Sequence, residues 1–230
     1  MKGGVGERDL PGATDVFRAA AALPLAARAH LAVRRWTAPW DRILASCGRG
    51  DSLLDVGCGP GLLAHLLSHR GFAGTYSGVD PDGRKVGRAR AWVGETPRRT
   101  FRAGSVEAAE GTAFDEAVIV DVLYLVRRAE RARFVADVVA RLGPSGRLLV
   151  LTSGGGPRWK RAVDRAQERV AVGLVGLTQG EAVEPCDGAE VAALLAAAGL
   201  SDVRVEDAGA GYLHGFELVS GRRGASPTAR

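Results

Sequence analysis

Short apolar runs alternate along most of the chain with longer segments in which apolar residues recur every three or four positions. The first pattern is typical of buried strands and the second of amphipathic helices, so their alternation predicts βαβ units and a parallel sheet. The predicted strands are Ser52–Val56, Thr75–Asp80, Thr100–Ala103, Phe114–Asp121, Arg147–Thr152, Val203–Asp207 and Leu213–Ser220. The predicted helices between them are Gly61–Ser68, Gly83–Val93, Ala129–Leu142 and Gly188–Ala198.

Two connections refine this pattern. Gly143–Gly146 should be a turn that stops one helix and starts the next strand. The last two strands are joined only by Ala208–Tyr212, which is too short for a crossover helix, so they must form an antiparallel hairpin. The pattern therefore predicts an α/β fold with six parallel strands, one antiparallel hairpin strand, and helices on both faces of the sheet.

A glycine-rich turn follows the first predicted strand. The residues Leu53–Leu63 read as an apolar strand, a turn with the spacing GxGxG, and the start of a helix near Pro60. A dinucleotide-binding turn would instead have the spacing GxGxxG, but Leu62 occupies the position of its third glycine. Asp55 also stands directly before the turn, where a carboxylate would repel a pyrophosphate at the helix N-terminus. The pattern thus favours a ligand that is cationic and lacks phosphate.

Polar residues also follow the second and third predicted strands. Asp80 ends the second strand, 25 residues after Asp55, where its carboxylate can accept hydrogen bonds from both hydroxyls of a ribose. Helix capping is the structural alternative for such an aspartate. Gly104, Ser105 and Val106 follow the third strand, where a loop can run past an adenine ring.

Four segments together resemble the successive motifs of the class I S-adenosylmethionine-dependent methyltransferases of bacterial, small-molecule type. They are Asp55–Gly61, Asp80, Phe114–Leu125 and Leu142–Leu151, within a match from about Ser52 to Thr152. The resemblance implies a Rossmann-like seven-stranded sheet and S-adenosyl-L-methionine as the cofactor, with S-adenosyl-L-homocysteine as its product. It implies cofactor contacts by Asp55, Gly57, Cys58, Gly59, Gly61, Leu62, Asp80, Pro81, Gly104, Ser105, Val106, Asp121 and Val122. Many relatives carry an aspartate where Ser105 stands, and Glu107 is the alternative partner for the adenine amine.

We expect one methyltransferase domain over residues 1–230, because this length suits a single core and the composition is that of an ordinary globular protein. Residues 1–50 should supply two helices, Asp15–Arg35 and Ala38–Cys47, that cover the site. Residues 51–152 would form the cofactor-binding core, and 153–186 an insertion that acts as a lid. Residues 187–220 would form the last helix and the hairpin, and 221–230 a loose tail.

Charge and cysteine content exclude several classes of protein. The net charge is +5, but only Lys2, Lys85 and Lys160 among the 31 basic residues are lysines, and the arginines are scattered among acids. We therefore expect a solvated basic surface and no nucleic-acid partner. Three cysteines without a CxxC pair support neither a disulfide framework nor a metal site. Without a signal sequence or an apolar run of membrane-spanning length, we expect a cytoplasmic protein, a monomer or a homodimer, with peripheral but not integral membrane contact.

The acceptor side of the reaction is less defined. Tyr124 follows the fourth strand, where it can wall the acceptor pocket or orient the nucleophile, and His214 in the hairpin is the candidate base. Packing is the structural alternative for both. Residues expected to contact the substrate are Trp36, Tyr124, Arg158, Trp159, Arg161 and Tyr212. No metal constellation is visible, and no tetrapeptide typical of planar-nitrogen methylation is present.

These features predict methyl transfer to a small, apolar or aromatic metabolite, at oxygen. Methylation of carbon or nitrogen, in a small molecule or a lipid, remains an alternative within the same family. A cofactor-binding module without turnover is an alternative of another class, and a dinucleotide oxidoreductase is a third.

Overall fold

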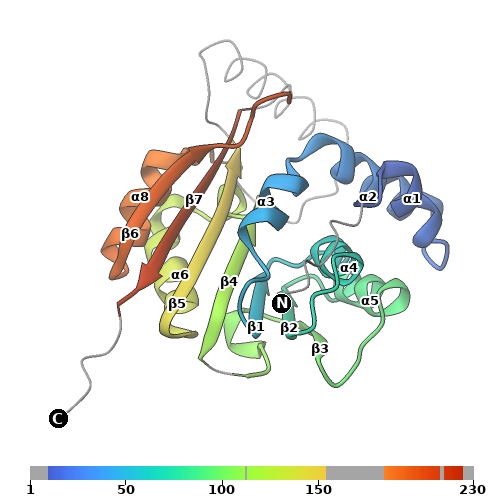
Figure 1. Ribbon diagram of the computed structural model, residues 1–230, viewed down its shortest axis with the longest axis horizontal. Coiled ribbons are helices and arrows are strands. Elements are labelled where there is room, and N and C mark those ends of the chain that lie inside the picture. The colour runs from blue at the N-terminus through green and yellow to red at the C-terminus, as the bar shows by residue number, and fades with distance from the viewer. Residues whose placement is uncertain (1–9, 112, 154–183, 213–214, 225–230) are drawn as a thin grey trace, which may run out of the picture.

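A seven-stranded sheet runs through the part of the chain that the computed structural model describes, residues 10–111, 113–153, 184–212 and 215–224 (Figure 1). Its strands are β1 (Ser52–Val56), β2 (Thr75–Asp80), β3 (Arg99–Ala103), β4 (Phe114–Val120), β5 (Leu142–Ser153), β6 (Leu200–Asp207) and β7 (Phe216–Arg223). They lie in the order β3-β2-β1-β4-β5-β7-β6, and only β7 runs antiparallel to its neighbours. The predicted sheet of six parallel strands and one antiparallel hairpin strand is therefore confirmed.

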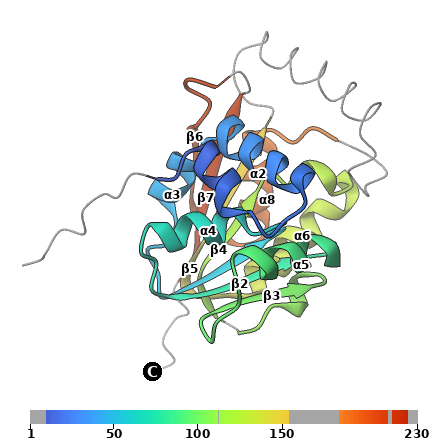
Figure 2. The ribbon, with the colours of Figure 1, turned by 90° about the vertical axis from the view of Figure 1, so that its right-hand side faces the viewer.

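Helices cover both faces of the sheet because successive strand residues point to opposite sides. Leu53 packs with α4 (Leu62–His69) and α5 (Gly83–Trp92), whereas Leu54 packs with α6 (Arg128–Ala140) and α8 (Gly188–Ala197). Figure 2 shows these helices on the two sides of the sheet. Both leucines are fully buried, and each such burial contributes about 1.5–3 kcal/mol to folding.

Three helices precede the sheet among the described residues. They are α1 (Ala13–Ala19), α2 (Leu25–Thr37) and α3 (Trp40–Ser46). The prediction of one continuous helix over Asp15–Arg35 is wrong, because Pro24 lacks the N–H that a helix interior needs and stands between α1 and α2. Figure 1 shows α1 and α2 at the same end of the molecule as the arrowhead of β5, so these helices lie near the carboxyl ends of the parallel strands.

Two predictions about the later strands need correction. Gly143–Gly146 is not a free turn but an irregularity within β5, where the pairing with β4 shifts between Phe114 and Glu116. Ser145 takes a left-handed φ of 63° there, which lets the strand absorb the extra residues and continue. Strand β7 begins at Phe216, and Gly215 before it is not part of the strand, whereas Leu213 and His214 lie outside the described residues. The residues Gly221–Arg223 pair with β5 and β6, so they do not belong to a loose tail.

The strand order reverses between β1 and β4, which makes the carboxyl ends of these strands the point where open α/β sheets bind ligands. Two short 3₁₀ helices, η1 (Val106–Ala108) and η2 (Leu123–Leu125), follow β3 and β4 at this edge. No described helix is long and apolar enough to cross a membrane.

Candidate active site

The glycine turn joins β1 to α4 at the reversal of the strand order. The N–H groups of Gly57 and Cys58 both donate to the carbonyl of Val79 in β2, at 2.8 and 3.0 Å. These bonds draw the turn across the end of β2 and towards Asp80. Gly61 caps α4 in a left-handed conformation, so the helix begins at Leu62, one residue later than predicted.

Gly57 and Gly59 are required for different reasons. Both have left-handed backbones, with φ of 79° and 54°. A Cβ on Gly57 would lie 2.4 Å from Cγ2 of Val122, so the protein itself excludes a side chain there. A Cβ on Gly59 would meet no protein atom within 4 Å. The backbone of Gly59 thus faces open space, as a surface that a ligand approaches would.

Asp55 is a buried carboxyl group at the end of β1. Its Oδ2 accepts a hydrogen bond from the hydroxyl of Tyr76 at 2.5 Å. Burial raises the pKa of Asp55 to about 7, the hydrogen bond from Tyr76 opposes this rise, and the carboxylate of Asp80 adds to it. A nearby cation would favour the charged form and reverse this shift.

Asp80 holds the glycine turn in place. Its Oδ2 accepts from the N–H of Gly59, and its Oδ1 from the N–H of Asp82, both at 2.9 Å. Asp82, not Asp80, caps α5, because its side chain accepts from the N–H of Arg84. Helix capping therefore does not explain Asp80, which is only 5% exposed and leaves lone pairs on each oxygen for further donors.

Two other side chains support the turn. Burial raises the pKa of the Cys58 thiol, and the carboxylates of Asp55 and Asp80 raise it further, so this thiol stays protonated and is no nucleophile. The indole Nε1 of Trp92 donates to the carbonyl of Pro60 at 2.5 Å. Trp92 was not predicted as a site residue, since a single aromatic on a helix gives no sequence signal for such a contact.

The loop after β3 is tied to the same centre. The N–H of Gly104 donates to the carbonyl of Asp80 at 3.0 Å, and Val106 is 5% exposed. The hydroxyl of Ser105 donates to the carboxylate of Glu107, so the two candidates for the adenine amine lie side by side. The structure thus brings all three predicted cofactor loops to one edge of the sheet. Pro81, which follows the buried Asp80, is exposed.

The exit of β4 forms the fourth part of the site. Asp121 has a left-handed φ of 58°, and its Oδ2 accepts from Nη1 of Arg34 in α2 at 2.6 Å. Its Oδ1 accepts from the hydroxyl of Ser153 at 3.1 Å. The carboxylate of Asp121 is therefore engaged by protein groups, while its predicted cofactor contact remains a prediction. Tyr124 lies just beyond, in η2.

A buried arginine in α6 holds the backbone around η2 through hydrogen bonds. Arg131 in α6 is fully buried and forms an ion pair with Glu190 at 2.8 Å. Its guanidinium also donates to backbone carbonyls, namely those of Leu123, Val126, Glu184 and Pro185. All charge on this buried group is thus compensated, as a buried cation requires.

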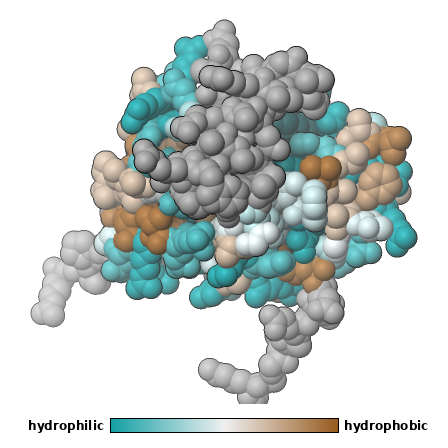
Figure 3. All heavy atoms as spheres, turned by 90° about the horizontal axis from the view of Figure 1, so that it is seen from above, coloured by the Kyte–Doolittle hydropathy of each residue, from teal (hydrophilic) through white to brown (hydrophobic). Residues whose placement is uncertain are grey.

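The predicted substrate residues are not all brought together. Trp36 is 75% exposed and stands two residues from Arg34 in α2, which places it on the opposite side of that helix from the site. Tyr212 packs edge-on against Phe216, with ring centroids 5.9 Å apart. Seen from above the carboxyl edge, the described surface is mostly hydrophilic with separate hydrophobic patches (Figure 3). Arg158, Trp159, Arg161 and His214 lie outside the described residues, as do residues 154–183 of the lid predicted over 153–186. Ser153 belongs to β5.

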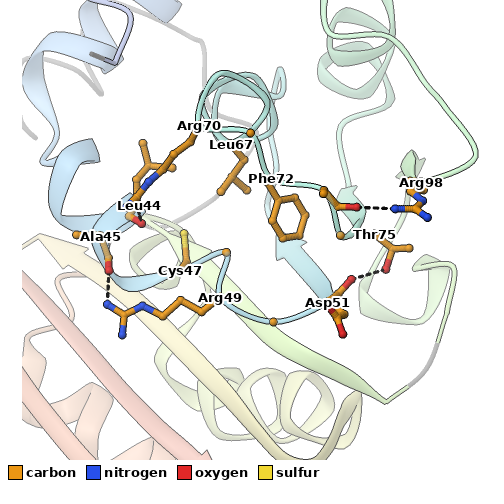
Figure 4. A pocket seen from close by; sticks show the side chains of 15 residues that line it. Leu44, Ala45, Cys47, Arg49, Asp51, Leu67, Arg70, Phe72, Thr75 and Arg98 are labelled. Atoms are coloured by element: carbon orange, nitrogen blue, oxygen red, sulfur yellow. Dashed lines mark hydrogen bonds between the residues drawn. The ribbon is translucent and has the colours of Figure 1, made fainter. Parts of the chain in front are cut away.

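A cavity of about 740 Å³ lies at the opposite, amino-terminal edge of the sheet (Figure 4). It includes Arg49, Arg70 and Arg98, each of which donates to a backbone carbonyl. None of the residues predicted from the sequence to bind cofactor or substrate lines it. These arginines therefore support the loops around the strand starts.

The donor set at that edge suits S-adenosylmethionine. Two buried carboxyl groups, Asp55 and Asp80, flank a turn whose middle glycine faces open space. Such carboxylates attract an ammonium and a sulfonium and accept from ribose hydroxyls, but they oppose a pyrophosphate. Among the described residues, no group of His, Cys, Asp and Glu is arranged to hold a metal ion.

Comparison with known proteins agrees with this arrangement. A family model described as a methyltransferase domain matches residues 27–205, which is more than half of the chain. The chain therefore belongs to the methyltransferase domain family. Its predicted identity as a class I S-adenosylmethionine-dependent methyltransferase is confirmed at this level, as is the cofactor that the family uses.

Individual relatives are more distant. The mitochondrial ubiquinone biosynthesis O-methyltransferase of Schizosaccharomyces pombe is 28% identical over 110 residues, which are 46% of this chain and 39% of that protein. The S-adenosylmethionine-dependent methyltransferase SibL has a TM-score of 0.66 at 21% identity, over 94% of this chain and 62% of its own. Human N-acetylserotonin methyltransferase, solved with SAM, has a TM-score of 0.64 at 17% identity, over 93% and 57%. The chain thus spans about two fifths to three fifths of these relatives, and the two structures show the fold alone.

Proposed function

We propose that this domain transfers a methyl group from S-adenosylmethionine to an oxygen atom of a small, apolar or aromatic metabolite. The observation that carries the proposal is the pair of buried carboxyl groups, Asp55 and Asp80, on either side of the open backbone at Gly59. The cofactor supplies an activated methyl group for in-line displacement, so most of the task left to the protein is positioning.

Each part of the site has a role in this proposal. Asp55 attracts the cationic end of the cofactor, and Asp80 accepts from the ribose while its two backbone contacts hold the turn. The loop Gly104–Val106 borders the adenine. Tyr124, carried by η2 beyond Asp121, faces the acceptor as a wall or an orienting hydroxyl. Oxygen as the accepting atom is supported by the relative named as an O-methyltransferase.

The acidity of Asp55 predicts how binding depends on pH. With a pKa near 7, Asp55 is protonated below pH 7 and cannot attract a cation there. We expect the affinity for S-adenosylhomocysteine to fall roughly tenfold per pH unit below that pKa, because binding must first remove the proton. Isothermal titration between pH 5.5 and 8 measures this.

The raised pKa of Asp55 also predicts that the stability of the fold changes with pH in the opposite direction to ligand binding. A carboxyl group whose pKa is raised by folding stabilises the protein at low pH, and this contribution is lost as the pH rises through about 7. Asp55→Asn should therefore raise the free energy of unfolding above pH 7 by about 1–3 kcal/mol and abolish the pH dependence of binding. Asp82→Asn, two residues beyond Asp80, is the control in urea denaturation. If the affinity of D55N for S-adenosylhomocysteine depends on pH as that of the wild type does, Asp55 is excluded as a cofactor-binding residue.

His214 remains the candidate base from the sequence. We expect His214→Ala to lower the turnover number by about tenfold or more and to change the affinity for S-adenosylhomocysteine little, since a base acts on the acceptor alone. Radiolabelled methyl transfer and calorimetry measure the two effects. An unchanged turnover number would return His214 to a structural role.

A further inference from the structure

Asp121 stands where the chain leaves β4 in a conformation that residues with side chains rarely adopt. Its φ is 58°, yet its N–H still donates to the carbonyl of Leu151 in β5 at 3.0 Å. A non-glycine residue persists in this region when its surroundings hold it there. The surroundings are two side chains from elements distant in sequence.

The two carboxylate oxygens of Asp121 are divided between these partners. Oδ2 accepts from Nη1 of Arg34 at 2.6 Å, and Oδ1 from the hydroxyl of Ser153 at 3.1 Å. The side chain of Asp121 is 8% exposed and that of Arg34 is 30% exposed, so water screens the pair little on the side of the aspartate. The contact joins α2 to the carboxyl edge of the sheet across 87 positions of sequence.

The backbone of Arg34 is held by a contact with α3. Its carbonyl accepts from the indole Nε1 of Trp40 at 2.7 Å, at the corner between α2 and α3. Burial alone would lower the pKa of its guanidinium, but the ion pair and hydrogen bond with Asp121 and an electrostatic interaction with Tyr124 raise the pKa overall. The charge of Arg34 therefore acts on both Asp121 and Tyr124.

The residues after Asp121 connect the two halves of the site. Val122 lies so close to Gly57 that a Cβ on that glycine would be 2.4 Å from it. The next residues form η2, which carries Tyr124. A change in the backbone of Asp121 would therefore shift both Val122, which packs against the glycine turn, and Tyr124.

We propose that Arg34 is a positioning residue for the acceptor half of the site, acting through Asp121 to set the path of Val122–Tyr124. This inference rests on the proposed function, because it assigns the acceptor to the side of Tyr124. Arg34 belongs to the N-terminal helices, so the proposal gives α2 a part in catalysis beyond covering the core.

Amide hydrogen exchange tests the link without an acceptor. In Arg34→Gln, exchange at residues 122–126 should accelerate about tenfold or more, because the left-handed turn loses its anchor. In Arg34→Lys, which keeps the charge, it should accelerate less. Arg35→Gln is the matched control, since Arg35 lies next in α2 and pairs with Asp41 at 3.2 Å, away from β4. Equal exchange in R34Q and R35Q would overturn the proposal.

The variant Asp121→Gly provides a second test, which shows whether Arg34 acts through the side chain of Asp121. Glycine adopts a left-handed backbone without an anchoring side chain, so Arg34→Gln should have no further effect on residues 122–126 in this background. An undiminished effect of R34Q in D121G would mean that Arg34 acts elsewhere, and would also contradict the proposal.

Turnover then separates positioning from plain structural support. With labelled S-adenosylmethionine and 3,4-dihydroxybenzoate as the probe acceptor, Arg34→Gln should lower kcat/KM for the phenol about tenfold or more. Its Kd for S-adenosylhomocysteine should rise by less, by about threefold at most, because Asp55 and Asp80 keep their positions and only Val122, beside the glycine turn, is displaced. If the wild type fails to methylate this phenol, the proposed function loses support, while the exchange experiments still decide the role of Arg34.

Discussion

Replacing Gly59 by valine should abolish the binding of S-adenosylhomocysteine and leave the protein folded. The backbone of Gly59 faces open space, so the new side chain meets no protein atom within 4 Å. It would instead occupy the space through which the ligand approaches the turn. We expect at least a roughly hundredfold loss of affinity by calorimetry, equivalent to about 2.7 kcal/mol.

The left-handed backbone of Gly59 requires a control, because valine is strained there regardless of any ligand. Gly199, at the end of α8, also has a left-handed φ, of 86°, and open space around its Cβ position. Gly199→Val should therefore cost a similar free energy of unfolding, about 1–2 kcal/mol, and bind normally. If G59V is folded by circular dichroism and binds as well as G199V, the glycine turn is not the cofactor site.

Replacing Asp80 by alanine should weaken S-adenosylhomocysteine binding by about 1.5–3 kcal/mol, or roughly 10- to 150-fold. The substitution removes the proposed acceptor for the ribose and also the anchor of the Gly59 and Asp82 N–H groups. The two losses act in the same direction, because the second frees the turn that the ligand needs ordered.

Asp82→Ala separates binding from general damage in this region. Asp82 caps α5 and pairs with Arg84 at 3.0 Å, so its loss should cost about 1 kcal/mol of stability without changing affinity. Equal affinities of D80A and wild type in calorimetry would exclude Asp80 from the ribose site, whatever the stability of either variant.

The sheet could be predicted because each strand buries a run of apolar residues and each turn is marked by glycine, proline or aspartate. The bounds of β1 and β2 were predicted to the residue, since both strands are almost wholly buried and each has an aspartate within its last two residues. The break at Pro24 was missed although proline is a local signal, because the apolar spacing on either side of it fits one helix. The irregular pairing at Gly143–Gly146 was missed because it depends on how β5 pairs with β4, which the local sequence does not show.

The placement of the proposed cofactor loops at one edge of the sheet could be predicted because their signals are local: a strand, a glycine turn, and a carboxylate at a strand end. The supports of those loops could not. Tyr76 contacts Asp55 because Gly78, its neighbour on the same face of β2, pairs with Asp55 in register. Arg34 meets Asp121 through the packing of α2, which no local pattern encodes. Only the alternation along β2 gave a signal that could have suggested Tyr76.

One titration tests the central claim that Asp55, Gly59 and Asp80 form a site for S-adenosylmethionine. The wild-type protein is titrated at pH 8, where Asp55 is charged, with S-adenosylhomocysteine and, separately, with NADH and NADPH. We predict saturable binding of one S-adenosylhomocysteine per chain and no binding of either dinucleotide. Binding of a dinucleotide, or no heat with S-adenosylhomocysteine under conditions where the protein is folded, would contradict the account.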